Sequence, residues 1–336
     1  MAWFTDAIDA AMEATVVPSF TRIGPRVRRR LHGWRPLEEF DLAGARIVLT
    51  GANSGLGLAA ARRLAQMGAQ LHLLVRSEEK GRRTLERLDD DRKAPMTYGV
   101  ADLTDLGSVR RFAADARNRL DGVDVLAHNA GAMFGDRRET VDGLERTFSV
   151  HVAGPYLLTC ELLPELESAA PSRVIWMSSG GMYAQRLDMD RIESPDDYRP
   201  ATAYARAKRA QVVLADLLQD RWGPRGISFH AMHPGWADTP GVARSLPGFR
   251  TVMGPLLRDA EQGADTLVWL AAAPEHEVAG GGFWHDRARR ARHKLPTTRV
   301  PDRESVRLLE QLMSTTGCDG RGDASTSPPN EDHHRD

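Results

Sequence analysis

A tyrosine and a lysine lie four residues apart in the stretch Tyr204-Ala205-Arg206-Ala207-Lys208. On a helix, this spacing brings both side chains to the same face. A phenol has an ordinary pKa near 10, and a nearby cation lowers such a pKa by about 1 to 3 units. The pair therefore predicts a proton donor and acceptor that works close to neutral pH. It is informative because the chain has only five tyrosines and four lysines.

Two adjacent hydroxyls, on Ser178 and Ser179, lie at the end of an apolar run. The carboxyl ends of strands are where ligands bind in open α/β sheets. The pair is therefore a candidate for a binding or catalytic role. The alternative is that these serines only form the turn into Gly180 and Gly181.

A glycine-rich turn follows the first predicted strand and opens a helix: Thr50-Gly51-Ala52-Asn53-Ser54-Gly55-Leu56-Gly57. Such glycines allow a tight turn and let the backbone approach a pyrophosphate, whose charge is favoured at a helix N-terminus. The spacing departs from the commoner G-x-G-x-x-G pattern. The turn predicts a dinucleotide site, and a glycine-rich loop without a ligand is the alternative.

Arg76 lies at the end of the second predicted strand, where an NAD-binding protein normally has an acidic residue for the ribose 2′-hydroxyl. A guanidinium can instead pair with a 2′-phosphate through charge-assisted hydrogen bonds. We therefore expect NADP(H) to be preferred over NAD(H). An ordinary surface arginine in an arginine-rich chain is the competing explanation.

These residues belong to a pattern of alternating strands and helices, which predicts a parallel sheet. Strands buried on both faces read as continuous apolar runs, as at 47–49. The sequence thus predicts an α/β fold over 41–316, with a doubly wound parallel sheet of about seven strands and helices on both faces. Strands are expected at 46–50, 70–76, 96–101, 123–128, 173–178, 227–232 and 282–285, and helices near 56–67, 105–119, 142–168, 201–222 and 261–273.

Two appendages flank this domain. Residues 1–40 carry apolar stripes at helical spacing and a basic run at 26–30, which predicts an amphipathic helical extension. We expect the extension to pack on the domain, and contact with an anionic membrane surface is the alternative. Residues 317–336 are rich in Gly, Ser, Pro, Asp and His and predict a disordered tail.

Composition excludes several classes of protein. The 45 basic and 46 acidic residues give a net charge of -1, so there is no overall attraction to nucleic acid. Cys160 and Cys318 are the only cysteines, which excludes a disulfide scaffold or a cysteine metal site and favours a reducing compartment. The longest apolar run, 267–273, is too short to span a bilayer, and the N-terminus lacks a signal-peptide pattern. We expect a cytoplasmic protein.

Taken together, the motifs resemble the short-chain dehydrogenase/reductase family and its retinol-dehydrogenase-like branch. The likeness spans roughly residues 41–300. It implies a Rossmann-type fold and hydride transfer between a nicotinamide and a carbonyl or alcohol group. Three further motifs after predicted strands contribute to it: Asp102-Leu103, Asn129-Ala130-Gly131, and Pro234-Gly235 with Thr239.

The resemblance implies a role for each matched residue. Tyr204 would protonate the developing alkoxide, Ser179 would hold the carbonyl oxygen, and Lys208 would bond the nicotinamide ribose and lower the tyrosine pKa. Ser179 is preferred to Ser178 because it matches the family's catalytic serine. Besides Tyr204 and Lys208, the cofactor is expected to meet Gly51, Ser54, Gly55, Leu56, Gly57, Arg76, Asp102, Leu103, Asn129, Ala130, Gly131, Pro234, Gly235 and Thr239.

Two histidines depart from the family pattern. His151 stands where the family usually has an asparagine, the fourth catalytic residue, which positions a water in the proton relay behind the lysine. An imidazole also donates and accepts hydrogen bonds but has an ordinary pKa near 6.5. We expect the relay to survive with an altered pH dependence, the alternative being a helix residue that tolerates exchange. His128 replaces the first asparagine of an N-N-A-G motif, at a structural position.

An apolar segment follows the sixth predicted strand, where family members have a mobile substrate lid. Its character favours a lipophilic carbonyl or alcohol substrate, and an oligomer interface or plain core is the alternative. The segment contains Trp236, Val242, Leu246, Phe249, Val252, Met253, Leu256 and Leu257.

The predicted function is that of an NADP-dependent oxidoreductase. The alternatives are a catalytically weak NADP(H)-binding regulator or scaffold, and a membrane-surface adaptor that acts through residues 1–40. A homo-oligomer paired through the helices near 105–119, 142–168 and 201–222 is a family expectation.

Overall fold

A parallel sheet forms the centre of the protein in the computed structural model, which describes residues 2–194, 196, 198–245 and 247–320. Its strands are hydrogen-bonded in the order β3-β2-β1-β4-β5-β6-β7-β8, and all run parallel except β8. The strands are β1 (Arg46–Thr50), β2 (Gln70–Val75), β3 (Met96–Val100), β4 (Val125–His128), β5 (Ser172–Met177), β6 (Ile227–Met232), β7 (Gly282–His285) and β8 (Ala288–Arg289). The predicted α/β fold is confirmed, and the two-residue β8 adds an eighth strand.

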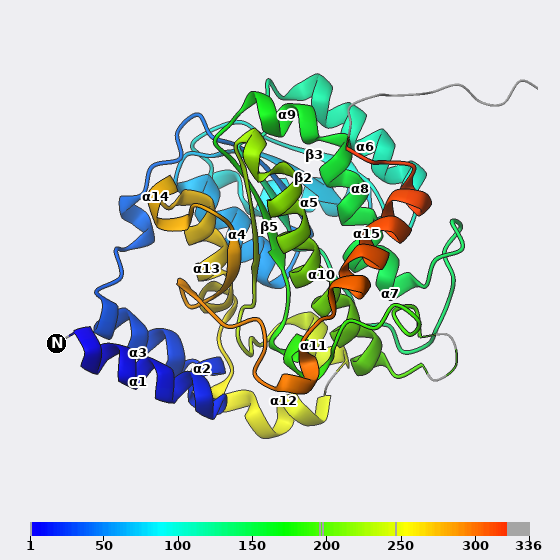
Figure 1. The fold of residues 1–336 in the computed structure, drawn as a ribbon. Helices are drawn as coiled ribbons and strands as arrows, with labels where there is room; N and C mark the ends of the chain where they lie inside the picture. The colour runs from blue at the N-terminus through cyan, green and yellow to red at the C-terminus, as the bar shows by residue number, and fades with distance from the viewer. Residues whose placement is uncertain (1, 195, 197, 246, 321–336) are drawn as a thin grey trace, which may run out of the picture.

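Helices cover both faces of the sheet, and a separate hydrophobic core lies on each face. One core joins the sheet to α6, α8 and α10, and the other joins it to α4 and α13 (Figure 1). The layers place the carboxyl ends of β1 to β6 along one edge of the sheet. The helices between the strands include α4 (Gly55–Gln66), α5 (Glu78–Arg87), α6 (Leu106–Arg119), α10 (Pro200–Trp222), α13 (Ala260–Ala272) and α14 (Glu275–Val278).

The helix expected near 142–168 consists of four shorter pieces. They are α7 (Arg146–Phe148), a π-helical turn η3 (Ser149–Ala153), α8 (Gly154–Glu161) and α9 (Leu163–Ser168). Pro155 and Pro164 lie in the first turns of α8 and α9, where the missing N–H of proline is tolerated. The apolar periodicity continues through these breaks, so it could not reveal them. Helix α5 was not expected either, because its sequence is mostly charged.

A C-terminal helix without an expected counterpart, α15 (Asp302–Thr316), lies along α10 (Figure 1). Its Leu308 and Leu312 are fully buried in the core on that face. After it, the Tyr156 hydroxyl donates a hydrogen bond to Cys318 O at 2.9 Å, so residues 317–320 lie against the domain. The rest of the predicted tail is outside the described residues. Helix α15 thus covers part of the helical surface through which pairing was expected.

The N-terminal extension forms three helices, α1 (Ala2–Thr15), α2 (Val17–Phe20) and α3 (Ile23–His32). They pack on the domain beside the segment that follows β6 (Figure 1). Phe20 is buried, whereas Trp3 and Phe4 are 76% and 58% exposed. Among the described residues, no helix is both long enough and apolar enough to cross a membrane.

The segment after β6, predicted as a lid, contains α11 (Pro240–Ser245), α12 (Pro247–Met253) and a 3₁₀ turn η6 (Gly254–Leu256). We refer to residues 236–258 as the β6–α13 loop. Leu246 and the side chain of Val242 lie outside what the structure describes. Within the loop, the rings of Trp236 and Phe249 meet edge to face at 5.3 Å.

Candidate active site

Tyr204 and Lys208 lie one turn apart on α10, as their spacing predicts. The Lys208 Nζ atom is 5.4 Å from the centre of the Tyr204 ring. Lys208 is buried and donates a hydrogen bond to Met177 O at 2.6 Å, at the end of β5. Tyr204 is half-buried. Helix α10 and strand β5 therefore set the distance between the phenol and the ammonium group.

The two serines after β5 have different surroundings. The buried Ser178 hydroxyl donates to Lys208 O at 2.8 Å, so it ties β5 to α10. The half-buried Ser179 side chain hydrogen-bonds to the Tyr204 side chain and accepts a hydrogen bond from Gly181 N at 3.2 Å. Ser179 is therefore the serine that shares a site with the tyrosine, in agreement with the expected pairing.

The pKa values of the pair differ from the expected ones. Burial raises the pKa of Tyr204, and the hydrogen bond with Ser179 acts in the opposite direction without reversing the effect. The predicted lowering of the tyrosine pKa by Lys208 is thus wrong for this geometry. Burial also lowers the pKa of Lys208, to about 7. Near pH 7 the Tyr204 phenol is therefore protonated and can donate its proton.

His151 lies in the π-helical turn η3, next to the tyrosine. The two rings are 5.2 Å apart and meet edge to face. His151 Nε2 and Ala132 O are 2.8 Å apart, so Nε2 donates this hydrogen bond, and the buried Nδ1 atom has no partner among the described residues. A π-helical turn inside a helix is a frequent feature of functional sites. The free Nδ1 atom can accept a hydrogen bond from a water or a ligand group.

The pKa of His151 lies well below its ordinary value because of burial and the nearby Lys208 ammonium group. The ring is therefore neutral near pH 7. Because the His151 ring does not change its charge near pH 7, we no longer expect it to alter the pH dependence of the reaction. The His151 ring also packs directly against Gly131. A Cβ added at Gly131 would lie 2.4 Å from His151 Cε1, so only glycine fits at position 131.

Replacing His151 with asparagine is expected to preserve turnover and to leave the pH–rate profile between pH 6 and 8 unchanged, because both side chains are neutral there. His151→Ala removes the hydrogen-bonding atoms and is expected to lower kcat about tenfold, equivalent to roughly 1.4 kcal/mol. Steady-state rates of the three proteins over this pH range test both statements. A step near pH 6.5 that only the histidine protein shows would contradict them.

His128, the other departure, lies in the core. Its ring is 4.4 Å from that of Trp176, and its Nε2 atom is 2.8 Å from the Thr159 hydroxyl. Burial lowers its pKa to about 3. These contacts agree with a structural position.

The glycine turn between β1 and α4 is tightly packed. A Cβ added at Gly57 would lie 2.2 Å from Gly51 O, so no larger residue fits there. Gly51 and Gly55 adopt φ values of 73° and 55°, in the left-handed region that favours glycine. Ser54 is the N-cap of α4, and Leu56 lies in its first turn. The turn thus carries the main chain closely past the N-terminus of a helix of 12 residues, which fits a pyrophosphate group.

Thr50, which sequence reasoning did not single out as a site residue, holds this turn against the next one. Its buried hydroxyl accepts hydrogen bonds from Asn129 N and Ala130 N at 3.0 and 2.9 Å. Asn129 Nδ2 donates in return to Thr50 O at 2.9 Å and to Gly51 O at 3.2 Å. In the sequence, Thr50 could have been recognised as the single hydroxyl residue at the end of an otherwise apolar predicted strand. These bonds join the ends of β1 and β4.

Arg76 and Asp102 lie beyond the ends of the neighbouring strands β2 and β3, and both are exposed. Within the described part of the chain, the Arg76 guanidinium forms no ion pair. The Asp102 carboxylate accepts two hydrogen bonds from Thr104, one from the main-chain N at 2.9 Å and one from the side-chain hydroxyl at 2.8 Å. Leu103 beside it is buried. This edge therefore offers a cation and an apolar side chain to the adenosine end of a dinucleotide.

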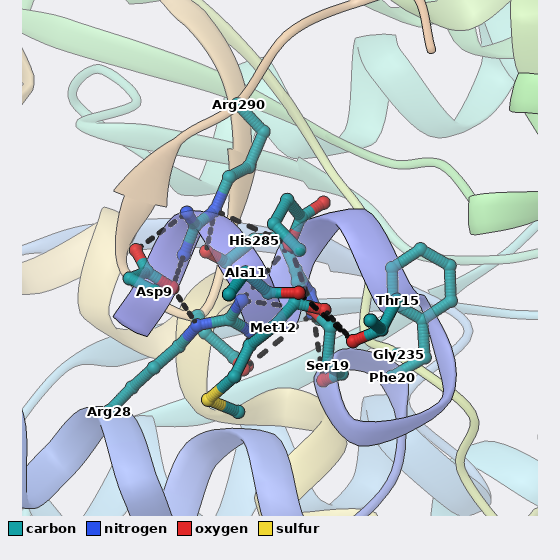
Figure 2. A network of polar contacts seen from close by, with 12 residues as sticks. Asp9, Ala11, Met12, Thr15, Ser19, Phe20, Arg28, Gly235, His285 and Arg290 are labelled. Carbon is teal, nitrogen blue, oxygen red and sulfur yellow. Dashed lines mark hydrogen bonds and ion pairs between the residues drawn. The ribbon is translucent and has the colours of Figure 1, made fainter. Parts of the chain in front are cut away.

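The loop after β6 closes the other side of the candidate site. The nearest Thr239 atom lies 3.5 Å from the position of a Cβ on Gly55, so this loop meets the glycine turn. Gly235 follows Pro234 and has a φ of 75°. A Cβ added there would lie 2.4 Å from Arg258 Nε and 2.7 Å from Phe20 O. Gly235 thus packs against the Arg258 side chain and against the main chain of Phe20, which belongs to the N-terminal extension (Figure 2).

The expected site residues therefore line the carboxyl ends of β1 to β6. The first strands lie in the order β3-β2-β1-β4, so the glycine turn and the 129–131 turn flank the point where the chain reverses its direction across the sheet. Such a switch point is where dinucleotides bind. With a protonated phenol and a hydroxyl at one end, the arrangement can bind a dinucleotide and donate a proton to an oxygen atom nearby.

Comparisons with known proteins agree with this geometry. The family model described as short chain dehydrogenase matches residues 45–247. Dehydrogenase/reductase SDR family member 12 of Homo sapiens is 36% identical over 82% of this chain and 89% of its own. Retinol dehydrogenase 14 of Homo sapiens is 32% identical over 79% of this chain and 84% of its own. A crystal structure from Mycobacterium paratuberculosis has a TM-score of 0.65, with 27% identity over 84% of this chain and 98% of its own.

Proposed function

Since the chain belongs to the short-chain dehydrogenase/reductase family, whose members are oxidoreductases, we propose that it is an NADP-dependent oxidoreductase acting on a carbonyl or alcohol group of a lipophilic substrate. The observation that carries this proposal is the contact of Tyr204 with Ser179 and Lys208 at the switch point of the sheet. The reducing direction is favoured because the Tyr204 phenol keeps its proton at neutral pH.

When bound, NADPH supplies the hydride in this direction. The Tyr204 hydroxyl donates its proton to the oxygen of the substrate as negative charge develops there. The Ser179 hydroxyl holds the same oxygen, which its hydrogen bond to Tyr204 prepares it to do. Lys208 would bond the ribose next to the nicotinamide, and His151 would hold a water through Nδ1 behind the lysine. The pyrophosphate would lie along Gly51, Ser54, Gly55, Leu56 and Gly57, with Pro234, Gly235 and Thr239 at the nicotinamide end.

Arg76→Ala is expected to weaken NADPH binding by about 10- to 100-fold, because it removes charge-assisted hydrogen bonds worth about 1.5–3 kcal/mol. NADH, which lacks the 2′-phosphate, should bind with less than about a twofold change. Fluorescence titration with both cofactors measures this difference. Arg82→Ala is the matched control, since Arg82 is an exposed arginine paired with Glu86 at 3.2 Å on α5. Equal losses for NADPH and NADH in Arg76→Ala would contradict the NADP preference.

The lipophilic substrate is favoured by the apolar β6–α13 loop and by the likeness to a retinol dehydrogenase. The test is incubation of a cell extract of lipids and metabolites with the protein and deuteride-labelled NADPH, followed by mass spectrometry. A labelled lipophilic alcohol that is missing with Tyr204→Phe would support the proposal. Cofactor binding without any labelled product, in either reaction direction, would favour the NADP(H)-binding regulator instead.

We also propose a cytoplasmic location with peripheral contact to a membrane through the extension. Trp3 and Phe4 are exposed on α1, Arg26 and Arg30 are exposed on α3, and Arg22 is exposed at the N-cap of α3. An extension that exposes both aromatic and cationic side chains has the features that suit an anionic lipid surface.

The double variant Trp3→Ser, Phe4→Ser is expected to reduce binding to phosphatidylserine vesicles at least about tenfold, since burying each ring contributes about 1.5–3 kcal/mol. Co-sedimentation measures the bound fraction. Val141→Ser, at an 86% exposed position on another part of the domain, is the control. Equal pelleting of the double variant and the parent protein would exclude this contact.

A further inference from the structure

Residues 19–22, which comprise the end of α2 and the turn into α3, hold both ends of the β6–α13 loop. At the start of the loop, Trp236 N donates to Phe20 O at 2.7 Å. At its end, Arg22 N donates to Leu256 O at 3.0 Å. The Arg258 guanidinium also donates to Phe20 O at 3.0 Å. A segment more than 200 residues earlier in the chain thus binds the two points where the loop enters and leaves the domain.

The two ends of the loop are also bonded to each other. Arg258 N donates to Trp236 O and Asp238 N donates to Arg258 O, both at 2.8 Å. Residues 19–22 therefore add a third segment to a small hydrogen-bonded group. Since these bonds are main-chain or guanidinium contacts on both ends, they constrain the loop at its base and leave α11 and α12 to span between them.

Buried ion pairs and hydrogen bonds also hold residues 19–22 against the domain. Arg258 also donates to Ser19 O at 2.6 Å and pairs with Asp286 at 2.6 Å. The same carboxylate pairs with Arg28 of α3 at 2.6 Å. Arg28 in turn pairs with Asp9 of α1 at 2.6 Å (Figure 2). All three helices of the extension thus share one buried network with the end of the β6–α13 loop.

The Phe20 ring reaches the candidate active site from this segment. It lies 4.5 Å from the ring of His233, which precedes Pro234, and 5.7 Å from that of Trp236. A Cβ added at Gly180 would come within 2.5 Å of the Phe20 ring. Gly180 directly follows Ser179, so Phe20 packs behind the serine turn and behind the loop at the nicotinamide end. One aromatic ring therefore touches two of the segments that form the site.

We propose that Phe20 and Arg258 are positioning residues for the reaction, and that the N-terminal extension is a structural part of the active site. Through them, residues 19–22 hold the serine turn and the β6–α13 loop at the spacing that substrate binding requires. Neither residue is expected to touch the reacting atoms. The inference rests on the proposed function for its kinetic consequence and on the geometry alone for its effect on the loop.

Hydrogen–deuterium exchange of Phe20→Ala and Arg258→Met tests the positioning without any substrate. Amides of residues 236–258 are expected to exchange at least about tenfold faster, with the strands β1 and β4 unchanged. Phe20→Leu, which keeps most of the apolar volume, serves if Phe20→Ala does not fold, and it is expected to show a smaller increase in the same segment. Phe4→Ala, an aromatic truncation at an exposed position of the same extension, is the matched control and should leave the loop unchanged. Unchanged exchange of the loop in Phe20→Ala and Arg258→Met would overturn the proposal.

Kinetics separate this proposal from the proposed function. With a substrate found as above, the two variants are expected to raise KM at least about tenfold and to keep the affinity for NADPH within about twofold. Faster exchange of the loop in a protein that turns over no substrate would contradict the oxidoreductase proposal and leave the positioning intact. Faster exchange with unchanged KM and kcat would overturn the role of these residues in the site.

Discussion

Tyr204→Phe is expected to lower kcat for carbonyl reduction by about 10²- to 10⁴-fold, the usual contribution of a positioned proton donor. The substitution removes one oxygen atom and keeps the ring that meets His151 edge to face at 5.2 Å. The glycine turn and Arg76 are untouched, so the affinity for NADPH should change less than about twofold. A loss of turnover without a loss of cofactor binding is therefore the expected signature of a missing acid.

Single-turnover measurements with deuteride-labelled NADPH distinguish this result from a general defect. Tyr156→Phe is the matched control, because it also removes a phenol hydroxyl, one that donates to Cys318 O outside the candidate site. The control should keep its rate within about a factor of two. If Tyr204→Phe reduced the substrate at the rate of the parent protein, Tyr204 would not be the proton donor.

The pH dependence of the parent protein follows from the same side chain. Burial raises the pKa of Tyr204 above its ordinary value of about 10, so the acid form is present throughout the neutral range. Reduction should therefore stay constant with respect to this group near pH 7 and fall as the pH rises through the tyrosine pKa. Oxidation, which needs the phenolate as base, should instead rise with pH.

Asp286→Asn is expected to destabilise the protein by about 3–5 kcal/mol, the usual cost of breaking a buried ion pair by removing one partner. Asp286 is 3% exposed and pairs with Arg28 and Arg258, both of which would be left buried with less compensation. The residue has a φ of 50°, a conformation that asparagine also tolerates, so the substitution tests the charge rather than the backbone.

Chemical denaturation of the two proteins measures the difference in free energy of unfolding. Asp136→Asn is the control, because Asp136 is an exposed carboxylate paired with Arg138 at 2.6 Å, and water and salt screen such a pair so that its loss should change stability far less. An effect of Asp286→Asn as small as that of Asp136→Asn would show that the buried network contributes little to stability.

The difference should also depend on pH. Burial by itself raises the pKa of Asp286, but the Arg258 and Arg28 guanidiniums outweigh burial and hold it below the ordinary value. A lowered pKa means that the carboxylate stabilises the folded state above the pKa of the unfolded chain, near 3.9. This contribution is lost as the pH falls through the folded-state pKa. The gap between the two proteins should be constant from pH 6 to 8 and narrow below about pH 4.

Strand positions could be predicted well because a parallel strand buried on both faces appears in the sequence as a short continuous apolar run. The predicted strands at 46–50, 227–232 and 282–285 coincide with β1, β6 and β7. The spacing of Tyr204 and Lys208 placed both on α10 for a similar reason, since it depends on local geometry alone. The direction of the Tyr204 pKa depends instead on burial, which the spacing does not contain.

The extension shows where periodicity misleads. The apolar stripe of α1 includes Phe4, yet Phe4 is exposed, while Asp9 is buried and Glu13 is half-buried. The acidic residues face inward because Arg28, Arg290 and Lys294 lie on that side. Those partners come from other segments of the chain, up to 281 residues away, so no local pattern could identify them.

The long sequence separation within this network has a consequence for folding. Residues 19–28 are synthesised early, but Arg258 and Asp286, which hold them, are separated from them by more than 200 residues. Contacts of such high sequence separation form only after a large loss of chain entropy, so they form late. During synthesis the extension cannot pack on the domain until the chain has been made as far as strand β7 and Asp286, and Phe20 stays exposed until then. A segment that is synthesised before the rest of this domain is thus among the last parts of it to reach the native position, and the interval in which Phe20 is exposed is where chaperones would act on this protein.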